Sequence, residues 1–276
     1  MRKVYIILAL IILSLGYSDV ALADDITADV LTYDGKSKMV TAVGNVVIHA
    51  NQGATITGKR GQYNFIDRSA WIDGGIRYEK EQTIMTADKM YLYKDKTVRG
   101  VGSVYMNDEK EKRTLKGNDV MYNNDTGFGK INGNGYLETI DGIMEAPLIE
   151  GNMKQVKIVA SGGVRLSSVL HQMTGNSDEA VYTRTGQKGL DGKLTLIGNA
   201  HVIQNGNTFD GPELVMRDAE KVVETTGRST IVITNTESSP IGADSGKNDE
   251  STDGNNIRVT KETPIVGKPD YADEMA

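Results

Sequence analysis

The sequence contains no cysteine, and its 276 residues include only five prolines, three histidines and one tryptophan. Without cysteine there is no disulfide framework and no thiolate ligand, so the fold has to be stabilised by burial and strand pairing. The histidines are His49, His171 and His201, and none belongs to a His-x-His or His-Glu-x-x-His motif. The residues therefore predict no metal site and no cofactor.

Catalytic motifs are also missing. There is no Gly-x-Ser-x-Gly elbow, and the acidic pairs Asp24–Asp25 and Asp218/Glu220 resemble solvated chain ends and turns rather than paired active-site carboxylates. A formal net charge of −6 argues against a phosphate-seeking surface, so no nucleic acid partner is expected. The sequence predicts a protein that is not an enzyme.

Long apolar runs are confined to the first residues. Arg2 and Lys3 precede an apolar stretch from Val4 to Leu15, and a small-x-small site at 21–23 follows. This pattern is typical of a cleaved secretory signal peptide over residues 1–23, with a retained anchor as the alternative. Export of a cysteine-free chain predicts a location in the bacterial periplasm.

What is abundant is glycine, with 31 residues, in short apolar alternations separated by turn dipeptides. A first column pairs a large apolar residue with a small one two places later. Its members are Ile26/Ala28, Ile56/Gly58, Met85/Ala87, Leu115/Gly117, Met144/Ala146, Met173/Gly175 and Phe209/Gly211. Spacing by two places both residues on one face of a strand, and a period of about 30 predicts a repeated unit.

A second column, about sixteen residues further on, consists of glycines inside strand-like segments: Gly44, Gly74, Gly102, Gly133, Gly162, Gly198 and Gly227. A glycine within a strand indicates a bulge or bend where the chain folds over its own apolar face. Seven units of two short strands give about fourteen strands. We expect an all-β, elongated, twisted β-jellyroll of two facing sheets with open ends.

The domain boundaries follow from where the pattern stops. The repeats predict one domain over residues 24–235, and residues 236–276 form a low-complexity, disordered C-terminal tail. Within the tail, the brief apolar segments 257–259 and 265–266 offer a docking strand as the alternative.

The interior column has two interpretations. Most inward residues of a β protein serve only to pack a core. The alternation of flexible methionine with glycine can instead leave an apolar trough that accepts irregular guests. The candidates for lipid contact near the middle of the stack are Val46, Ile48, Ile56, Ile76, Met85, Val104 and Leu115. Lys59 is expected to face outward, and Ile76→Asp or Val104→Asp is expected to weaken lipid binding while the protein stays folded.

Several segments carry a family resemblance. Ile26-Thr-Ala-Asp-Val-Leu-Thr-Tyr33, Met85-Thr-Ala-Asp-Lys-Met90 and, more loosely, Leu115-Lys-Gly-Asn-Asp-Val-Met-Tyr122 resemble the motif of the LptA or OstA-like family of periplasmic lipopolysaccharide-transport proteins. The resemblance implies that the trough binds the lipid A part of lipopolysaccharide. It also implies that the protein stacks end to end with itself, and bridges an inner-membrane transporter component and an outer-membrane translocon.

Two other functions remain open. One is a structural or adhesive β-solenoid on the cell surface with a filled core. The other is a polysaccharide-active enzyme on a β-helix, which would need clustered carboxylates on one face. Strand direction separates these architectures, because a β-helix pairs its strands in parallel and a jellyroll pairs them largely antiparallel.

Overall fold

The computed structural model describes residues 23–50, 53–110, 112–123, 125–140, 142–152, 154–155, 157–185, 191–217 and 222–234, together with the backbone of 256–261. Except for Ala23 and residues 256–261, the predicted signal peptide and the predicted tail lie outside these residues.

The described chain is all-β, as the sequence predicts. The strands are β1 (Ala23–Thr27), β2 (Val30–Asp34), β3 (Met39–Ala50), β4 (Ala54–Asn64), β5 (Ala70–Lys80), β6 (Thr83–Leu92), β7 (Thr97–Asp108), β8 (Arg113–Asn123), β9 (Phe128–Thr139), β10 (Gly142–Asn152), β11 (Lys157–Ser168), β12 (Met173–Thr185), β13 (Asp191–Gln204), β14 (Asn207–Arg217), β15 (Val222–Thr226), β16 (Ser229–Thr234) and β17 (Asn256–Lys261). No helix in this part of the chain is long and apolar enough to span a bilayer.

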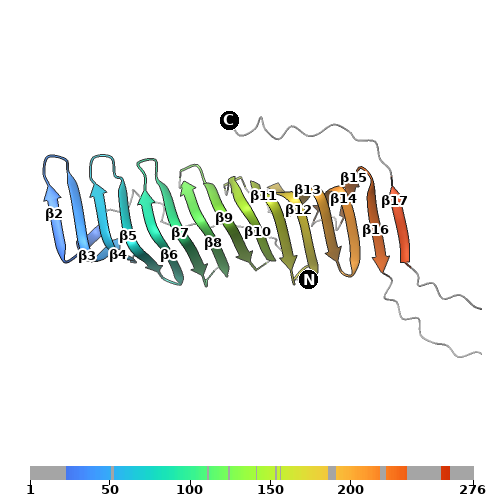
Figure 1. Cartoon of the computed structure of the whole chain (residues 1–276), viewed down its shortest axis with the longest axis horizontal. Helices are drawn as coiled ribbons and strands as arrows, with labels where there is room; N and C mark the ends of the chain where they lie inside the picture. The colour runs from blue at the N-terminus through green and yellow to red at the C-terminus, as the bar shows by residue number, and fades with distance from the viewer. Residues whose placement is uncertain are drawn as a thin grey trace, which may run out of the picture.

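The strands form one elongated antiparallel sheet that follows chain order (Figure 1). Strands β3 to β14 are a meander in which each strand pairs with the next. β1 and β2 both pair with β3, and β15 and β16 both pair with β14, so each couple acts as one broken strand. The seven predicted units thus correspond to fourteen strand positions, which confirms the expected number, and β17 adds one more.

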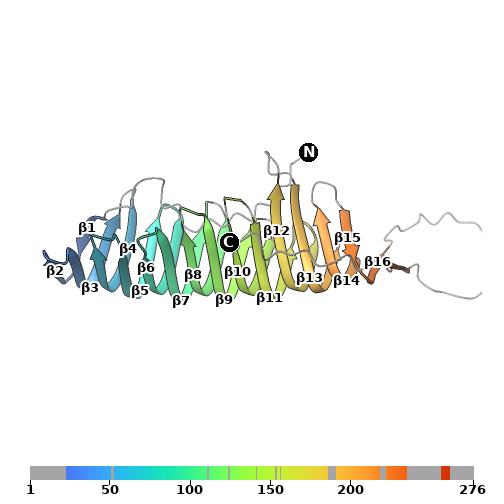
Figure 2. The same cartoon turned by 90° about the horizontal axis from the view of Figure 1, so that it is seen from above.

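Each strand of the meander is bent near its middle. The register shifts at one place in each of the eleven neighbouring pairs from β3 to β14. The second glycine column lies at these bends with positive φ, as at Gly102 (φ +78°), where a side chain would meet the Asp88 carboxylate. The bends curl the sheet into two facing halves (Figure 2). The two expected layers are therefore halves of one sheet, because the strands run through the bend unbroken.

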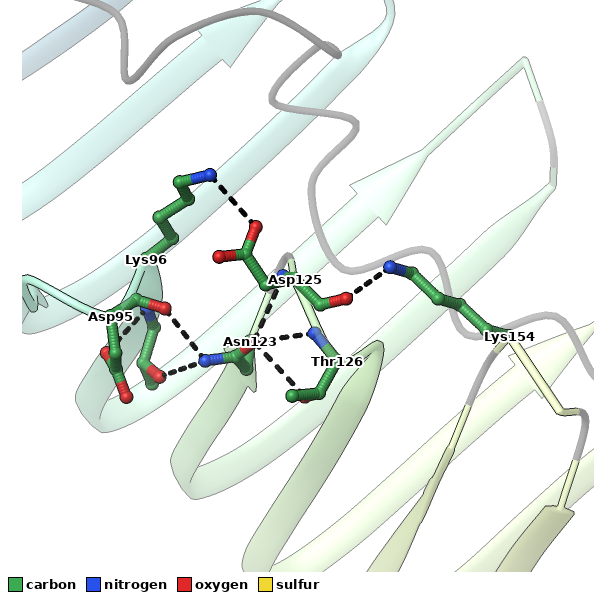
Figure 3. Close-up of polar contacts among 7 residues, drawn as sticks. Asp95, Lys96, Asn123, Asp125, Thr126 and Lys154 are labelled. Carbon is green, nitrogen blue, oxygen red and sulfur yellow. Dashed lines mark hydrogen bonds and ion pairs between the residues drawn. The ribbon is translucent and has the colours of Figure 1, made fainter.

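The two halves differ in their hairpin turns. One half, here called the Asx half, has described hairpin turns that are held by Asp or Asn side chains, as at Asp34 and Asn64. Asn123 accepts hydrogen bonds from the backbone N–H groups of Asp125 and Thr126 at 3.0 and 2.8 Å, and donates to the carbonyl oxygen of Asp95 at 2.9 Å. Figure 3 shows how these contacts join one turn to the next. The other half is called the opposite half.

Two lysines and a second asparagine continue this linkage. Lys96 Nζ lies 3.0 Å from the Asp125 carboxylate, and Lys154 Nζ donates to the Asp125 carbonyl oxygen (Figure 3). Asn152 Nδ2 donates to the Thr126 carbonyl oxygen at 3.1 Å. Consecutive units are thus joined at their turns as well as along their strands.

One unit differs in register from the sequence prediction. In the first column, Met173 and Gly175 correspond to Met144 and Ala146. In the structure, however, Leu166 is the Cα partner of Met144 on one side and of Gly175 on the other, so Gly175 takes the position of Met144. The small position falls instead on the residue two places after Gly175. The cause is the connection between β11 and β12, which is two residues longer than the connection between β9 and β10.

The backbone of Asn256–Lys261 also departs from the expectation of disorder. It forms β17, which pairs antiparallel with the whole of β16 from Ser229↔Lys261 to Thr234↔Asn256. For these six residues the docking strand, the alternative in the sequence analysis, replaces the disordered tail. The physical reason is the free backbone edge of β16, which offers unpaired hydrogen-bonding groups to a second strand.

Candidate functional site

All seven candidate lipid-contact residues face the interior. Val46, Ile76, Met85, Val104 and Leu115 are 1–4% exposed and belong to one continuous apolar core. Ile48 and Ile56 are partly buried and pack against the same core. Lys59 is exposed, as expected for an outward residue.

The register arranges inward side chains of the opposite half in a line across the sheet. This line, here called the apolar ladder, has one member at each strand position: Ile26, Ile48, Ile56, Tyr78, Met85, Met106, Leu115, Leu137, Met144, Leu166, Gly175, Val202, Phe209 and Ile231. At about 4.8 Å between strands, these members extend about 60 Å. Gly175 is the one member without a side chain, and Tyr78 is the one member with a polar group; the other twelve members are apolar.

The remaining candidates lie one layer closer to the bend. There, large and small residues alternate between neighbouring strands: Val46 is opposite Gly58, Ile76 opposite Ala87 and Val104 opposite Gly117. This layer and the apolar ladder form the inner surface of the opposite half.

The two columns of the sequence analysis do not include the large inward residues of the Asx half. Ile131, Ile158, Leu196 and Leu214 are 0% exposed there. A signal was present, since Ile131 and Leu196 each stand two residues before a glycine of the second column.

The glycines of the inner surface do not leave the trough that the alternation predicts. A Cβ at Gly58 would lie 2.8 Å from Ile72 Cγ1, and one at Gly117 would lie 2.6 Å from Ile131 Cγ2. Each of these glycines is therefore a socket that is filled by a larger side chain of a neighbouring strand. At these positions the expectation of open space is wrong, because apolar side chains occupy the region between the halves.

Tyr78 brings a polar group into the apolar ladder. Its side chain is 2% exposed. Burial, with a smaller contribution from the Glu81 charge, raises the pKa of Tyr78 to about 12. The phenol is thus held neutral in apolar surroundings.

Buried polar residues lie between the apolar ladder and the hairpin turns of the opposite half. These residues, here called the polar border, are Asp108, Arg113, Thr139 and Ser168. Asp108 and Arg113 are Cα partners at facing strand ends, and both are buried at 8% and 6% exposure. Thr139 and Ser168 occupy strand ends on the same side and are also buried. An amphiphile with its tails along the ladder would meet polar side chains here.

The outer face carries many charged side chains. Cross-strand pairs include Arg60 with Asp73 at 2.9 Å and Arg165 with Glu145 at 3.0 Å. Exposed pairs of this kind contribute at most about 1 kcal/mol each, so they mark the solvated face more than they stabilise it.

A shallow pocket of about 300 Å³ lies on this outer face, around Gly175. Its lining includes Arg165, Glu145 and His201. The Nδ1 atom of His201 lies 2.6 Å from the Asp210 carboxylate, and Arg165 is engaged by Glu145. Among the described residues, no group of three or more His, Asp or Glu side chains is placed to hold a metal ion.

The N-terminal end of the sheet leaves interior residues uncovered. Leu31 and Tyr33 share a face with their Cα partners Ala42 and Val40, yet they are 49% and 58% exposed. The whole of β2 is exposed because β3 is its only pairing partner in the described part of the chain. This end presents an open cross-section of the core.

Comparison with known proteins places these features in a family. A family model described as LptA/(LptD N-terminal domain) LPS transport protein matches residues 55–222. Among solved structures, the chain is similar to LptH, the LptA homologous periplasmic component of the lipopolysaccharide transport device from Pseudomonas aeruginosa. The identity is 14%, with 87% of this chain and 94% of that chain covered, and the TM-score is 0.20.

A search of the curated proteins finds no match. The family model covers more than half of the chain, including nearly all of β4 to β14 with most of the apolar ladder. The chain therefore belongs to the family of LptA and the N-terminal domain of LptD, the lipopolysaccharide transport proteins.

Proposed function

We propose that this protein carries lipopolysaccharide across the periplasm, from the inner to the outer membrane, with the acyl tails of lipid A lying between the two halves of the bent sheet along the apolar ladder. The ladder is the observation that carries this proposal. It runs the length of the sheet for about 60 Å and combines methionine with aliphatic side chains, which adapt to flexible chains. Val46, Ile76 and Val104 contact the tails from the layer beside it.

Because side chains fill the interior, an acyl tail can enter only if its burial compensates for the side-chain contacts that are lost. Complete burial of one Val, Leu, Ile or Met side chain contributes about 1.5–3 kcal/mol, so separating the halves over about five such residues costs roughly 10 kcal/mol. Burying one acyl tail of about fourteen carbons returns on the order of 10 kcal/mol, at about 0.8 kcal/mol per methylene. Tails can thus replace the side-chain contacts at little net cost, and pass along the sheet by local exchange.

The topology permits this separation. Among the described residues, strand pairing joins neighbours along the axis, and no strand pair connects the two rows of hairpin turns. The polar border with Asp108 and Arg113 lies where the sugar and phosphate groups of a bound lipid would emerge.

The ends of the sheet support stacking of one copy on another. β2 lies at the N-terminal edge and β15 at the C-terminal edge, both in the Asx half; β1 and β16 occupy the same edges in the opposite half. When two copies are placed end to end, β15 of one copy would pair antiparallel with β2 of the next copy, and β16 would pair with β1. The antiparallel strand order would then continue from one copy to the next. Such stacks, with an inner-membrane transporter component and an outer-membrane translocon at their ends, would bridge the two membranes.

A filled-core scaffold is the second candidate, because the sockets at Gly58 and Gly117 are occupied by side chains. The β-solenoid form of that candidate is wrong, since the strand pairs of the described chain are antiparallel. The same observation excludes the β-helix enzyme. A structural role for the antiparallel sheet itself is the alternative to transport.

Competition binding with intact and deacylated lipopolysaccharide separates the two functions. The purified chain is mixed with fluorescently labelled lipopolysaccharide, and unlabelled competitors are added. We expect intact lipopolysaccharide to displace the probe. The deacylated form keeps the sugars and phosphates but loses the tails, and should compete more weakly by roughly a hundredfold or more, because each buried methylene contributes to binding.

Equal competition by both forms would place recognition on the sugars and overturn the interior site. Absence of binding, by a chain shown to be folded by circular dichroism, would favour the scaffold. Ile76→Asp and Val104→Asp need the same folding control, since both positions are 2% exposed and an unpaired carboxylate there costs several kcal/mol.

A further inference from the structure

The C-terminal edge of the sheet is covered in one half only. β17 pairs with β16 over all six residues of β16, in the opposite half. β15, in the Asx half, pairs with β14 and has no strand on its outer edge in the described chain. In Figure 1, β17 lies beyond β16 at the end of the sheet away from β2.

β17 occupies the place that β1 of a second copy would take. β1 runs from the end of the opposite half toward the bend, antiparallel to β3, and Ile26 is its member of the apolar ladder. Ile231 is the ladder member on β16, paired with Phe209. In an end-to-end stack, Ile26 of the second copy would be the Cα partner of Ile231, but Val259 of the same chain holds that register position.

We propose that β17 is a built-in cap that competes with the β1 strand of a second copy for the outer edge of β16. This inference rests on the proposed end-to-end assembly and adds its regulation. With β17 in place, half of the C-terminal edge is closed to stacking; when it is released, the complete edge of β15 and β16 can receive β1 and β2.

Because β17 belongs to the same chain as β16, it has an advantage over the β1 strand of a separate copy. The 21 residues from 235 to 255 connect β16 to β17. A segment tethered within the same chain reaches an effective concentration in the millimolar range, far above the micromolar concentration of a separate copy in an ordinary assay. A partner that displaces β17 must therefore offer further contacts, and β2 on the free edge of β15 supplies them.

Two truncations of the chain test the cap. One ends after residue 255 and lacks β17; its matched control ends after Lys261 and keeps β17 while losing the rest of the tail. Self-association is measured by analytical ultracentrifugation over a range of concentrations. We expect the shorter chain to associate at a concentration roughly tenfold lower, or less, than the control and the full chain, because the intramolecular competitor is gone. Equal association of all three would overturn the proposal.

Paired cysteines test the register, because the chain has no native cysteine. Ile231→Cys with Val259→Cys is expected to form a disulfide within one chain and to hold it as a monomer. A mixture of the two single variants, Ile231→Cys and Ile26→Cys, is expected to give a disulfide-linked dimer whose yield rises when β17 is removed. A dimer yield that does not change on removal of β17 would contradict competition at this edge.

These outcomes are independent of lipid binding. If the truncations fail to change self-association while intact lipopolysaccharide still competes in the binding assay, only the cap is wrong. If lipopolysaccharide does not bind but removal of β17 promotes stacking, the cap stands and the transport function falls.

Discussion

Replacing Gly117 by alanine tests how the interior is packed. Gly117 lies on β8 opposite Val104, outside the left-handed region of the backbone, so a side chain brings no backbone strain there. Its Cβ would lie 2.6 Å from Ile131 Cγ2 and 3.2 Å from Val120 Cγ2. The matched control is Gly100→Ala, whose Cβ would lie no closer than 3.3 Å to Val104 Cγ2.

The two substitutions differ in expected magnitude. Overpacking of a filled core costs about 1–3 kcal/mol, while loss of glycine freedom in the unfolded chain returns about 0.4–1 kcal/mol. Gly117→Ala should therefore destabilise by about 1–2 kcal/mol, and Gly100→Ala should be close to neutral. The measurement is the urea midpoint of unfolding, followed by circular dichroism at constant m value.

A double substitution identifies the contact. Ile131→Ala alone should cost about 2–5 kcal/mol, because Ile131 is fully buried. Combined with Gly117→Ala, the new methyl group has room, and the pair should be more stable than the sum of the single effects by about 1 kcal/mol or more. If Gly117→Ala is as stable as the parent chain and shows no coupling to Ile131, the sockets are empty and the account of a filled interior is wrong.

Two further predictions concern the turn contacts and the buried phenol. Asn123→Ala removes the hydrogen bonds to Asp95, Asp125 and Thr126 and should lower the free energy of unfolding by about 1–3 kcal/mol. Asn123→Asp keeps the acceptor oxygens and should lose less stability. Thermal unfolding of both variants measures the difference, and equal losses would contradict the role of these acceptor oxygens. The pKa of Tyr78 is raised from 10.0 to about 12, so the folded chain holds the proton more tightly than the unfolded chain. Stability from this group is complete below about pH 10 and falls as the pH rises toward about 12, by roughly 2–3 kcal/mol at about 1.36 kcal/mol per pKa unit. Tyr78→Phe should lose less stability than the parent chain over that interval in urea unfolding, and an identical loss would show that Tyr78 does not titrate in this way.

The repeat and the bends could be predicted from the sequence because each depends on local rules. Alternation by two fixes which residues share a face, and glycine adopts positive φ more freely than other residues, so Gly102 marks the bend of β7 without knowledge of the fold. The inward placement of Met85 and Leu115 follows from the same alternation.

Features that depend on contacts between strands could not be predicted in this way. The two extra residues between β11 and β12 shift Gly175 from the small position to the ladder, and a fixed period conceals the shift. Whether Gly117 leaves space depends on Ile131, which reaches it only through the pairing of β8 with β9. The docking of β17 depends on the free edge of β16, which composition does not show.

Crosslinking along β7 and β8 tests most directly whether acyl tails lie between the halves of the sheet. A photoreactive residue replaces, one at a time, the inward Met106 and Leu115 and the outward Tyr105 and Lys116, and each folded variant is irradiated with lipopolysaccharide. We predict strong adducts from Met106 and Leu115 and at most background from their outward neighbours. Equal labelling from both faces, or labelling from Tyr105 and Lys116 alone, would contradict the account.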